Sequence, residues 1–244
     1  MCENVKFQKD ILVIIPAYNE AENIEKVIDE LSGYSSLVDY VIINDGSRDN
    51  TSEICHKRNY NIIDLPVNLG LAGAFQTGLK YAYRKGYEYA IQFDADGQHR
   101  PEYIAAIYEE IKKGYDIVVG SRFVNKKKNK SLRMFGNNMI SAAIRLTTGK
   151  KVFDSTSGMR MFNHKMIKEF ALNLNYGPEP DTLSYLLRNG IKLSEVQVDM
   201  AERMAGQSYL NFTKSMMYML RMMISILLVQ NFRQHREKVE ERRL

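Results

Sequence analysis

The 244-residue sequence is poor in cysteine and has no long hydrophobic run. Cys2 and Cys55 are its two cysteines, so neither a disulfide framework nor metal-ligand spacing exists, and a reducing cytoplasm fits. The first residues lack the long apolar stretch of a signal peptide, and no later stretch is apolar for long enough to span a bilayer. We therefore expect a protein that is not exported and does not cross a membrane.

Two glycine-rich phosphate-binding patterns are also missing. Gly70, Gly73 and Gly78 do not have the spacing of the G-x-G-x-x-G dinucleotide fingerprint, and no Gly-Lys-Ser/Thr triplet closes a phosphate loop. Any phosphate of a ligand must therefore be bound by a metal ion or by arginine.

Hydrophobic residues make up 45% and charged residues 26%, which excludes a collagen-like or wholly disordered chain and favours one large domain. Lys and Arg number 34 against 29 Asp and Glu, a formal net charge of +5. Two stretches, 121–135 and 210–236, carry basic residues and no acid. Each is either a solvated surface or the contact for an anionic partner, namely nucleic acid, a membrane or a phosphorylated substrate.

Apolar runs of strand length alternate with helical patterns through the first half of the chain. The strands are expected at 11–15, 40–43, 61–65, 87–93 and 116–119, and the helices at 20–31, 51–58, 70–85 and 101–112. This order predicts an α/β fold with a parallel sheet covered on both faces, and ligands in such sheets bind beyond the carboxyl ends of the strands.

Polar segments follow the expected strands at 16–20, 44–47, 68–70, 94–98 and 120–122. Three of them carry carboxylates, which indicates a functional edge, although 44–47 is equally typical of an ordinary turn. In the fourth, Asp94 and Asp96 point the same way and Gln98 adds an amide oxygen. These hard oxygen donors suit Mg²⁺ or Mn²⁺, and so sparse a site suggests that a diphosphate ligand completes the coordination.

A helix expected over 211–232 is amphipathic. Its polar stripe is Lys214, Tyr218, Arg221 and Ser225, and its apolar stripe is Phe212, Met216, Leu220, Met223 and Leu227. The helix contains no acid, so it suits the plane of an anionic membrane surface; packing in a core or in a dimer is the alternative.

Seven runs of the sequence together resemble family 2 inverting glycosyltransferases of the GT-A fold, in the branch similar to dolichol-phosphate mannosyltransferase. They are ILVIIPAYNEAENI, VIINDGSRDNT, NLGLAGA, FDADGQH, GSRF, DSTSGMRMF and ERMAGQS. The resemblance implies one Rossmann-like, mostly parallel sheet with helices on both faces. It also implies a catalytic domain over 1–210, with a nucleotide-sugar half at 10–120 and an acceptor half at 121–210, followed by a helical segment at 211–244.

The resemblance assigns roles to individual positions. The nucleotide sugar would lie against Pro16, Tyr18, Glu20, Asp45, Asp94 and Ala95. Asp96 and Gln98 would bind the Mg²⁺ or Mn²⁺ ion, and Arg122 and Arg133 would hold the acceptor phosphate and the donor diphosphate; Asp96 and the two arginines form the catalytic set.

Two further positions, Arg203 and Ser208, would lie in a loop that closes over the phosphates. The sequence departs from the family pattern at Asn44, where Asp is usual, and at Phe123, where Tyr is common.

The implied reaction moves a hexose from a UDP- or GDP-sugar to a polyprenyl phosphate, undecaprenyl or dolichyl. A phosphate acceptor is already largely dianionic at neutral pH and needs no general base, whereas a polysaccharide or glycolipid hydroxyl would need one, for which Glu179 or Asp181 is the candidate. A non-catalytic nucleotide-sugar-binding module is a third possibility. Nucleic acid is disfavoured because the basic stretches lack interleaved aromatic residues.

A lipid acceptor would place the protein in the cytoplasm, attached peripherally to the inner face of the cell membrane. A separate small membrane protein or a homo-oligomer would aid that attachment.

Overall fold

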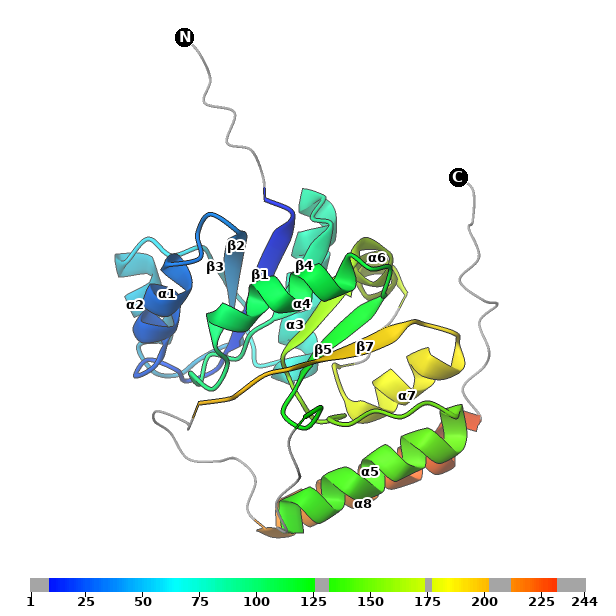
Figure 1. Ribbon diagram of the computed structural model, residues 1–244. Helices are drawn as coiled ribbons and strands as arrows, with labels where there is room; N and C mark the ends of the chain where they lie inside the picture. The colour runs from blue at the N-terminus through cyan, green and yellow to red at the C-terminus, as the bar shows by residue number, and fades with distance from the viewer. Residues whose placement is uncertain (1–8, 126–131, 174–176, 202–211, 232–244) are drawn as a thin grey trace.

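A seven-stranded sheet forms the centre of the protein in the computed structural model, which describes residues 9–125, 132–173, 177–201 and 212–231 (Figure 1). Its strand order is β3-β2-β1-β4-β6-β5-β7. The strands are β1 (Ile11–Ala17), β2 (Val38–Asn44), β3 (Ile62–Asp64), β4 (Tyr89–Gln92), β5 (Ile117–Ser121), β6 (Arg160–Asn163) and β7 (Leu193–Gln197). Every pairing is parallel except those of β6, which runs antiparallel to both β4 and β5.

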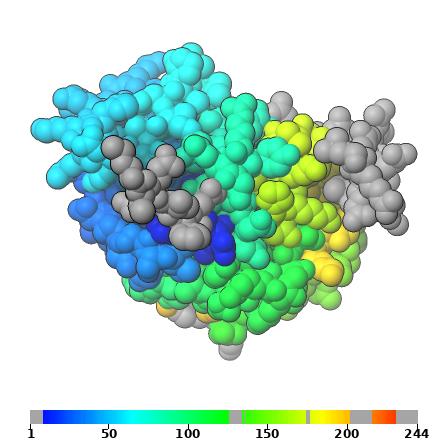
Figure 2. Space-filling model, turned by 90° about the horizontal axis from the view of Figure 1, so that it is seen from above, coloured from blue at the N-terminus to red at the C-terminus, as the bar shows by residue number. Residues whose placement is uncertain are grey.

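Helices cover both faces of this sheet, which confirms the predicted α/β architecture. They are α1 (Ile24–Ser32), α2 (Thr51–Lys57), α3 (Gly70–Lys85), α4 (Ile104–Ile111), α5 (Leu132–Thr148), α6 (His164–Leu172), α7 (Pro180–Arg188) and α8 (Phe212–Leu227), with short 3-10 turns at Pro101–Tyr103 and Val229–Asn231. Seen from above, the blue to cyan residues from the start of the chain lie directly beside the green to yellow residues that follow (Figure 2).

The core divides into two layers because successive side chains of a strand point to opposite faces. In β1, Leu12 and Ile14 join α3, α5, α6, α7 and α8 in one layer, whereas Ile11, Val13 and Ile15 join α1 and α4 in the other. All five side chains are at most 1% exposed, so burial on both faces explains why this strand is continuously apolar.

Two helices of the first half begin later in the structure than the sequence predicts. The helix expected over 101–112 is a 3-10 turn at Pro101–Tyr103 followed by α4, which begins at Ile104. The helix expected over 20–31 begins at Ile24, because the preceding residues form a turn that is bonded to the segment before α2. There the Glu20 backbone N–H donates to Thr51 Oγ1 at 2.9 Å, and the Ala21 N–H donates to Asp49 Oδ2 at 3.1 Å.

Within the described ranges, no helix combines the length and hydropathy needed to cross a bilayer.

Close packing of α3 on β1 gives a first prediction. A Cβ added at Gly78 would lie 2.2 Å from Ile14 Cγ2, so Gly78→Ala should overpack the core and lower the free energy of unfolding by about 1–3 kcal/mol. Gly33→Ala is the matched control, since its nearest neighbour would be Glu30 O at 3.6 Å and its φ of −60° already suits alanine. Urea unfolding measures both, and equal stability of the two variants would contradict this packing.

Candidate active site

The loops that follow β1, β2 and β3 meet at the carboxyl edge of the sheet. Asp45, which is 3% exposed, accepts a hydrogen bond from the Leu69 N–H at 2.7 Å. Asn19 donates its N–H to Ser47 Oγ at 3.0 Å and accepts one from the Arg48 N–H at 2.8 Å. These bonds join the segments in which Tyr18, Glu20 and Asp45 were expected to border a nucleotide; Pro16 pairs with Ile43 inside the sheet.

Asn44 occupies a position where the carboxylate of an aspartate would meet like charge. Its Nδ2 donates to Asp64 Oδ1 at 2.6 Å, and its own Oδ1 accepts from the Ser47 N–H at 3.2 Å. Burial tends to raise the pKa of Asp64, but hydrogen bonds from Asn44, His56 and Ser52 outweigh it and lower that pKa. An amide at position 44 therefore avoids the repulsion that two carboxylates would have at this place.

The loop after β4 carries Asp94, Ala95, Asp96 and Gln98. Asp94 Oδ1 accepts from Gln92 Nε2 at 2.9 Å, and the Gln98 N–H donates to Asp96 Oδ1 at 3.1 Å.

His99, which is 3% exposed, supports this loop from inside. Its Nδ1 accepts the Asp94 N–H at 2.9 Å, which assigns the ring proton to Nε2, and Nε2 lies 3.5 Å from Asp94 Oδ2. The backbone of the acidic loop is therefore held in place by a buried ring.

Carboxylate and amide oxygens from one short loop fit a divalent cation of the Mg²⁺ or Mn²⁺ type. Among the described residues, no group of three or more His, Cys, Asp or Glu side chains could hold a metal ion by itself. An ion held by oxygens of this loop would therefore need oxygens of a ligand to complete its coordination.

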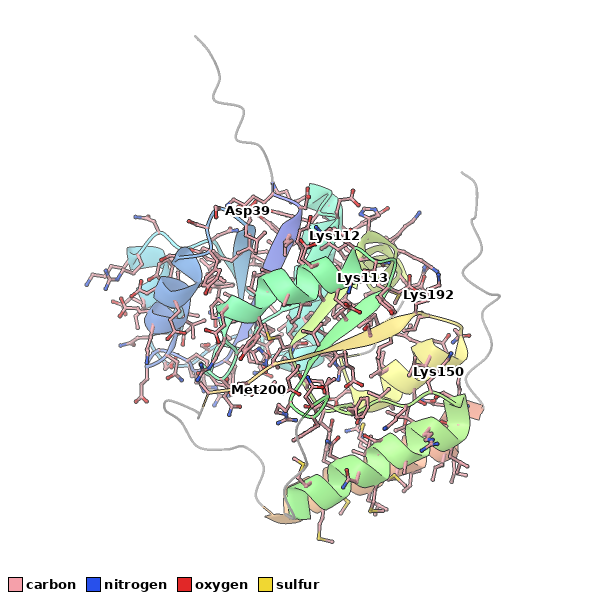
Figure 3. All side chains as sticks on the ribbon, viewed as in Figure 1. Asp39, Lys112, Lys113, Lys150, Lys192 and Met200 are labelled. Atoms are coloured by element: carbon pink, nitrogen blue, oxygen red, sulfur yellow. The ribbon has the colours of Figure 1, made fainter. Side chains whose placement is uncertain are left out.

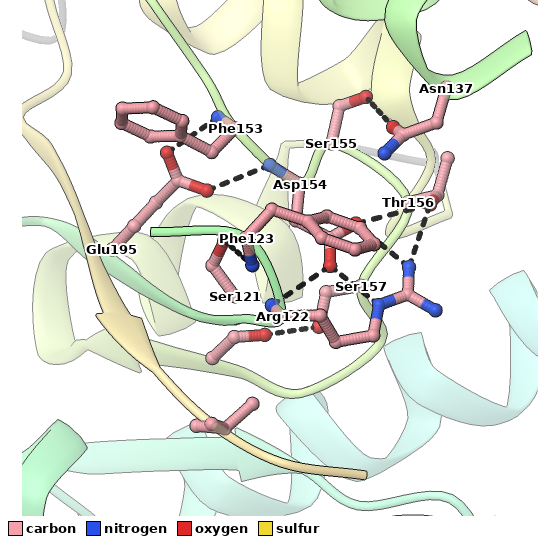
Figure 4. A network of polar contacts seen from close by, with 12 residues as sticks. Ser121, Arg122, Phe123, Asn137, Phe153, Asp154, Ser155, Thr156, Ser157 and Glu195 are labelled. Carbon is pink, nitrogen blue, oxygen red and sulfur yellow. Dashed lines mark hydrogen bonds and ion pairs between the residues drawn. The ribbon is translucent and has the colours of Figure 1, made fainter. Parts of the chain in front are cut away.

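On the other side of the edge, Arg122 forms a two-pronged ion pair with Asp154 (Figure 4). Arg122 Nε donates to Asp154 Oδ2 at 2.7 Å and Nη2 donates to Oδ1 at 2.8 Å; the Arg122 backbone N–H adds a bond to Oδ2 at 3.2 Å. Asp154 is fully buried, which by itself raises its pKa, but the hydrogen bond and charge of Arg122 prevail and lower it. Arg122 Nη2 also donates to Thr156 Oγ1 at 3.1 Å, and Nη1 takes part in none of these bonds.

The loop over 153–158 that supplies Asp154 is fixed from two sides. Glu195 accepts the N–H groups of Phe153 at 2.7 Å and Asp154 at 2.9 Å; burial raises the pKa of Glu195 despite these bonds (Figure 4). Arg160, which is 3% exposed, donates to the carbonyl oxygens of Ser155 and Ser157, each at 2.8 Å. The sequence predicts that residues 154–160 form a loop and strand lining the acceptor side, but it assigns no individual role to Asp154 or Glu195.

The same loop also reaches the acidic segment. A Cβ added at Gly158 would lie 2.7 Å from Asp94 Oδ2. Because β6 is antiparallel, its first residue lies at the carboxyl ends of β4 and β5, so the loop before β6 enters between Asp94 and Arg122. The topology thus brings the two expected halves of the site together.

Three further residues, Arg133, Arg203 and Ser208, were expected to contact the phosphates. Arg133 is in the first turn of α5, and Arg203 and Ser208 fall outside the described residues. Phe123 lies beside Arg122, whose Cζ is 5.2 Å from the ring centroid.

The two carboxylates considered as bases are bonded to α8. Glu179 accepts a hydrogen bond from the Tyr218 hydroxyl, and Asp181 Oδ2 accepts one from Ser225 Oγ at 2.7 Å. Burial, followed by the charge of Glu179, raises the pKa of Tyr218, which therefore stays a donor. Both carboxylates thus attach α8 to the start of α7.

Comparison with known sequences identifies relatives along most of the chain. The model of the family described as glycosyl transferase family 2 matches residues 12–170. The UDP-N-acetylglucosamine–dolichyl-phosphate N-acetylglucosaminyltransferase of Methanococcus voltae is 35% identical over 214 residues, which cover 78% of this chain and 85% of that protein. The polyprenol monophosphomannose synthase of Mycolicibacterium smegmatis is 26% identical over 210 residues, covering 81% and 79%.

Among solved structures, glucosyl-3-phosphoglycerate synthase from Mycobacterium tuberculosis has a similar fold. Its complex with Mn²⁺, uridine diphosphate and phosphoglyceric acid matches with a TM-score of 0.67 and 21% identity, covering 91% of this chain and 78% of that one.

The ion pair of Arg122 with Asp154 generates a prediction about stability. Asp154→Asn removes the charge that faces Arg122, and it should cost about 3 kcal/mol at pH 7, the low end for a buried pair because Arg122 is partly exposed. The folded-state pKa of Asp154 is lowered, so its contribution is present above the unfolded pKa of about 3.9 and is lost as the pH falls through the folded value. The deficit of Asp154→Asn should therefore shrink in acid.

Urea unfolding of both proteins across this pH range measures the effect. Glu102→Gln, which breaks the exposed pair of Glu102 with Arg100, is the control and should change the free energy of unfolding by less than about 1 kcal/mol. A deficit of Asp154→Asn that stays constant from neutral to acid pH would refute the assignment.

Proposed function

The chain belongs to the family 2 glycosyltransferases, and on this basis we propose that it moves a hexose from a nucleoside diphosphate sugar to a polyprenyl phosphate with inversion at the anomeric carbon. The observation that carries the proposal is the loop over 153–158, which lies between the acidic loop at Asp94 and the arginine at position 122. A donor diphosphate with its metal ion and an acceptor phosphate would need these two charges side by side.

On the donor side, Asp96 and Gln98 would hold Mg²⁺ or Mn²⁺, with Asp94 near the ribose and Pro16, Tyr18, Glu20, Asp45 and Ala95 around the rest of the nucleotide. A bound cation would stabilise the negative charge that develops on the departing diphosphate. The complex of the solved neighbour with Mn²⁺ and uridine diphosphate is in keeping with a divalent cation and a nucleotide at such a fold. The proposed donor is a UDP- or GDP-sugar.

On the acceptor side, Arg122 would bind the lipid phosphate through Nη1 while Asp154 fixes its orientation. A phosphate monoester is largely dianionic at pH 7, so its oxygen attacks as the bond to the diphosphate breaks, without a general base. One arginine 4 Å from the phosphate contributes about 4 kcal/mol of attraction at an effective dielectric constant of about 20. Arg133, Arg203 and Ser208 would add further contacts to the phosphates.

A hydroxyl acceptor is the alternative, and it would require a base. The candidates Glu179 and Asp181 are hydrogen-bonded to Tyr218 and Ser225 of α8, so they serve attachment of that helix. This use of both carboxylates favours the phosphate acceptor, and so do the printed activities of the relatives from Methanococcus and Mycolicibacterium.

A polyprenyl phosphate is a membrane lipid, and we therefore propose that the protein works peripherally at the cytoplasmic face of the cell membrane, within cell-envelope synthesis. In this proposal residues 1–210 form the catalytic domain and 211–244 the attached helical segment. A small membrane protein or a homo-oligomer would be an additional anchor.

Transfer of label from UDP- and GDP-sugars to undecaprenyl phosphate in detergent tests the function. We expect labelled lipid with Mg²⁺ or Mn²⁺ and none with chelator or with undecaprenol, which has a hydroxyl in place of the phosphate. Asp96→Asn should lower kcat by about 10²–10³ without unfolding the protein, and the exposed Glu102→Gln should leave it unchanged. Failure of every donor to label the phosphate lipid would reject the proposal.

Gly158 gives an independent test of the donor side. Gly158→Ala would push the Asp94 carboxylate from its position, so kcat/KM for the donor should fall by about tenfold or more while the melting temperature changes little. Gly33→Ala, which is remote from the edge, should retain normal kinetics. Normal donor kinetics in Gly158→Ala would show that the position of Asp94 is unimportant.

A further inference from the structure

Helices α5 and α8 lie side by side beyond the carboxyl edge of the sheet and expose an apolar surface to solvent (Figure 1). Among the described residues, most of the exposed large apolar side chains belong to these helices or directly follow α8. We name them the α5–α8 face: Met139, Leu146, Met216, Met217, Leu220, Ile224, Leu228 and Val229. Leu146 is 80% exposed and Met217 is 68% exposed, which is unusual for helices in contact with water alone.

Helix α8 carries apolar side chains on its inner and on its outer side. Of its expected polar stripe, Tyr218 and Ser225 bond inward to Glu179 and Asp181, while Arg221 is exposed. Of its expected apolar stripe, Met223 and Leu227 pack against the core, while Met216 and Leu220 are exposed. Met222 and Ile226 complete the inner side at 4% and 0% exposure. The core therefore holds α8 firmly by one side, and a second apolar side remains outside.

The charge of this surface indicates which partner would cover it. Neither α5 nor α8 contains Asp or Glu, while Arg145 and Arg221 are exposed, and the exposed Lys150 and Lys151 follow α5 (Figure 3). A second copy of this chain would bring the same cations against one another across a two-fold interface. Anionic lipid headgroups complement the cations, and the acyl region beneath them accepts the methionine, leucine and isoleucine side chains.

The inner side of α5 packs against the candidate acceptor site. The buried Asn137 of α5 accepts, at 3.3 Å, a hydrogen bond from Ser155 Oγ in the loop that holds Arg122. A surface resting on α5 and α8 would thus lie next to the arginine that is proposed to bind the lipid phosphate.

We propose that the α5–α8 face lies on an anionic bilayer, with its apolar side chains among the upper acyl chains and Arg145 and Arg221 at the headgroups. The proposal rests on the proposed function, because contact with the membrane is useful to the protein if Arg122 takes lipid phosphates from that membrane. Binding to vesicles without substrate is measured separately from transfer, so each can fail alone.

Co-sedimentation of the full chain with vesicles tests the face. The wild type should bind vesicles of phosphatidylcholine with phosphatidylglycerol and bind pure phosphatidylcholine weakly. Leu220→Glu should weaken binding by about tenfold or more, since it places a charge among acyl chains. Leu172→Glu is the matched control: Leu172 is 58% exposed and Leu220 is 56% exposed, but Leu172 lies on α6, and its substitution should leave binding unchanged.

Charge reversal measures the electrostatic contribution to vesicle binding separately from the apolar one. Arg221→Glu should weaken binding to the anionic vesicles by about tenfold or more and change little on pure phosphatidylcholine. Transfer to a short, water-soluble prenyl phosphate should persist in Leu220→Glu, while transfer to undecaprenyl phosphate in vesicles should fall.

Two results would overturn the proposal. One is equal vesicle binding by wild type, Leu220→Glu and Leu172→Glu. The other is a dimer, seen by light scattering, that Leu220→Glu dissociates, because a second copy would then occupy the face. Vesicle binding with the expected variant pattern but without any glycosyl transfer would reject the proposed function and leave the membrane face standing.

Discussion

A buried ion pair between Arg122 and Asp154 organises the candidate site. Asp154 has no exposed surface, so its charge is tolerable only because the guanidinium meets both of its oxygens. Their geometry in turn requires a rigid loop. Glu195 holds this loop by accepting a backbone N–H, and Arg160 holds it by donating to a backbone carbonyl. A charge that must be neutralised inside the protein thereby fixes the direction of an arginine at its surface.

Strand direction explains how such a loop comes to lie between two loops from distant parts of the chain. A parallel strand between β4 and β5 would have placed the segment before it at the amino edge. Because β6 is antiparallel, the residues before Arg160 lie at the carboxyl edge instead. Asp94, which follows β4, and Arg122, which follows β5, lie at the same edge. One reversed strand is therefore enough to join the segment that is proposed to bind a cation to the segment that is proposed to bind phosphate.

The sequence predicted the first half of the fold well, because each of its elements carries a local signal. Continuous apolar runs such as Ile11–Ile15 predict strands buried on both faces, and Gly70–Lys85 was predicted with its observed bounds. Beyond Ser121 the helix expected over 211–232 is present as α8, but the two strands carry weak signals: β7 is half-buried along its length, and β6 has only four residues. Asp154 and Glu195 gain their roles from partners 32 and 41 residues away, which no periodicity reveals.

The sequence separation of the paired strands also has a consequence for the order of folding. β4 pairs with β6 through Tyr89 and Asn163 and with β1 through Ile11 and Tyr89, which are long-range contacts of similar sequence separation. β1 with β2 and β2 with β3 are much closer in sequence, so the entropy of loop closure favours these two pairings first. A chain with only these three strands paired would contain the loops after β1, β2 and β3, with neither the acidic loop after β4 nor Arg122 yet in place beside them.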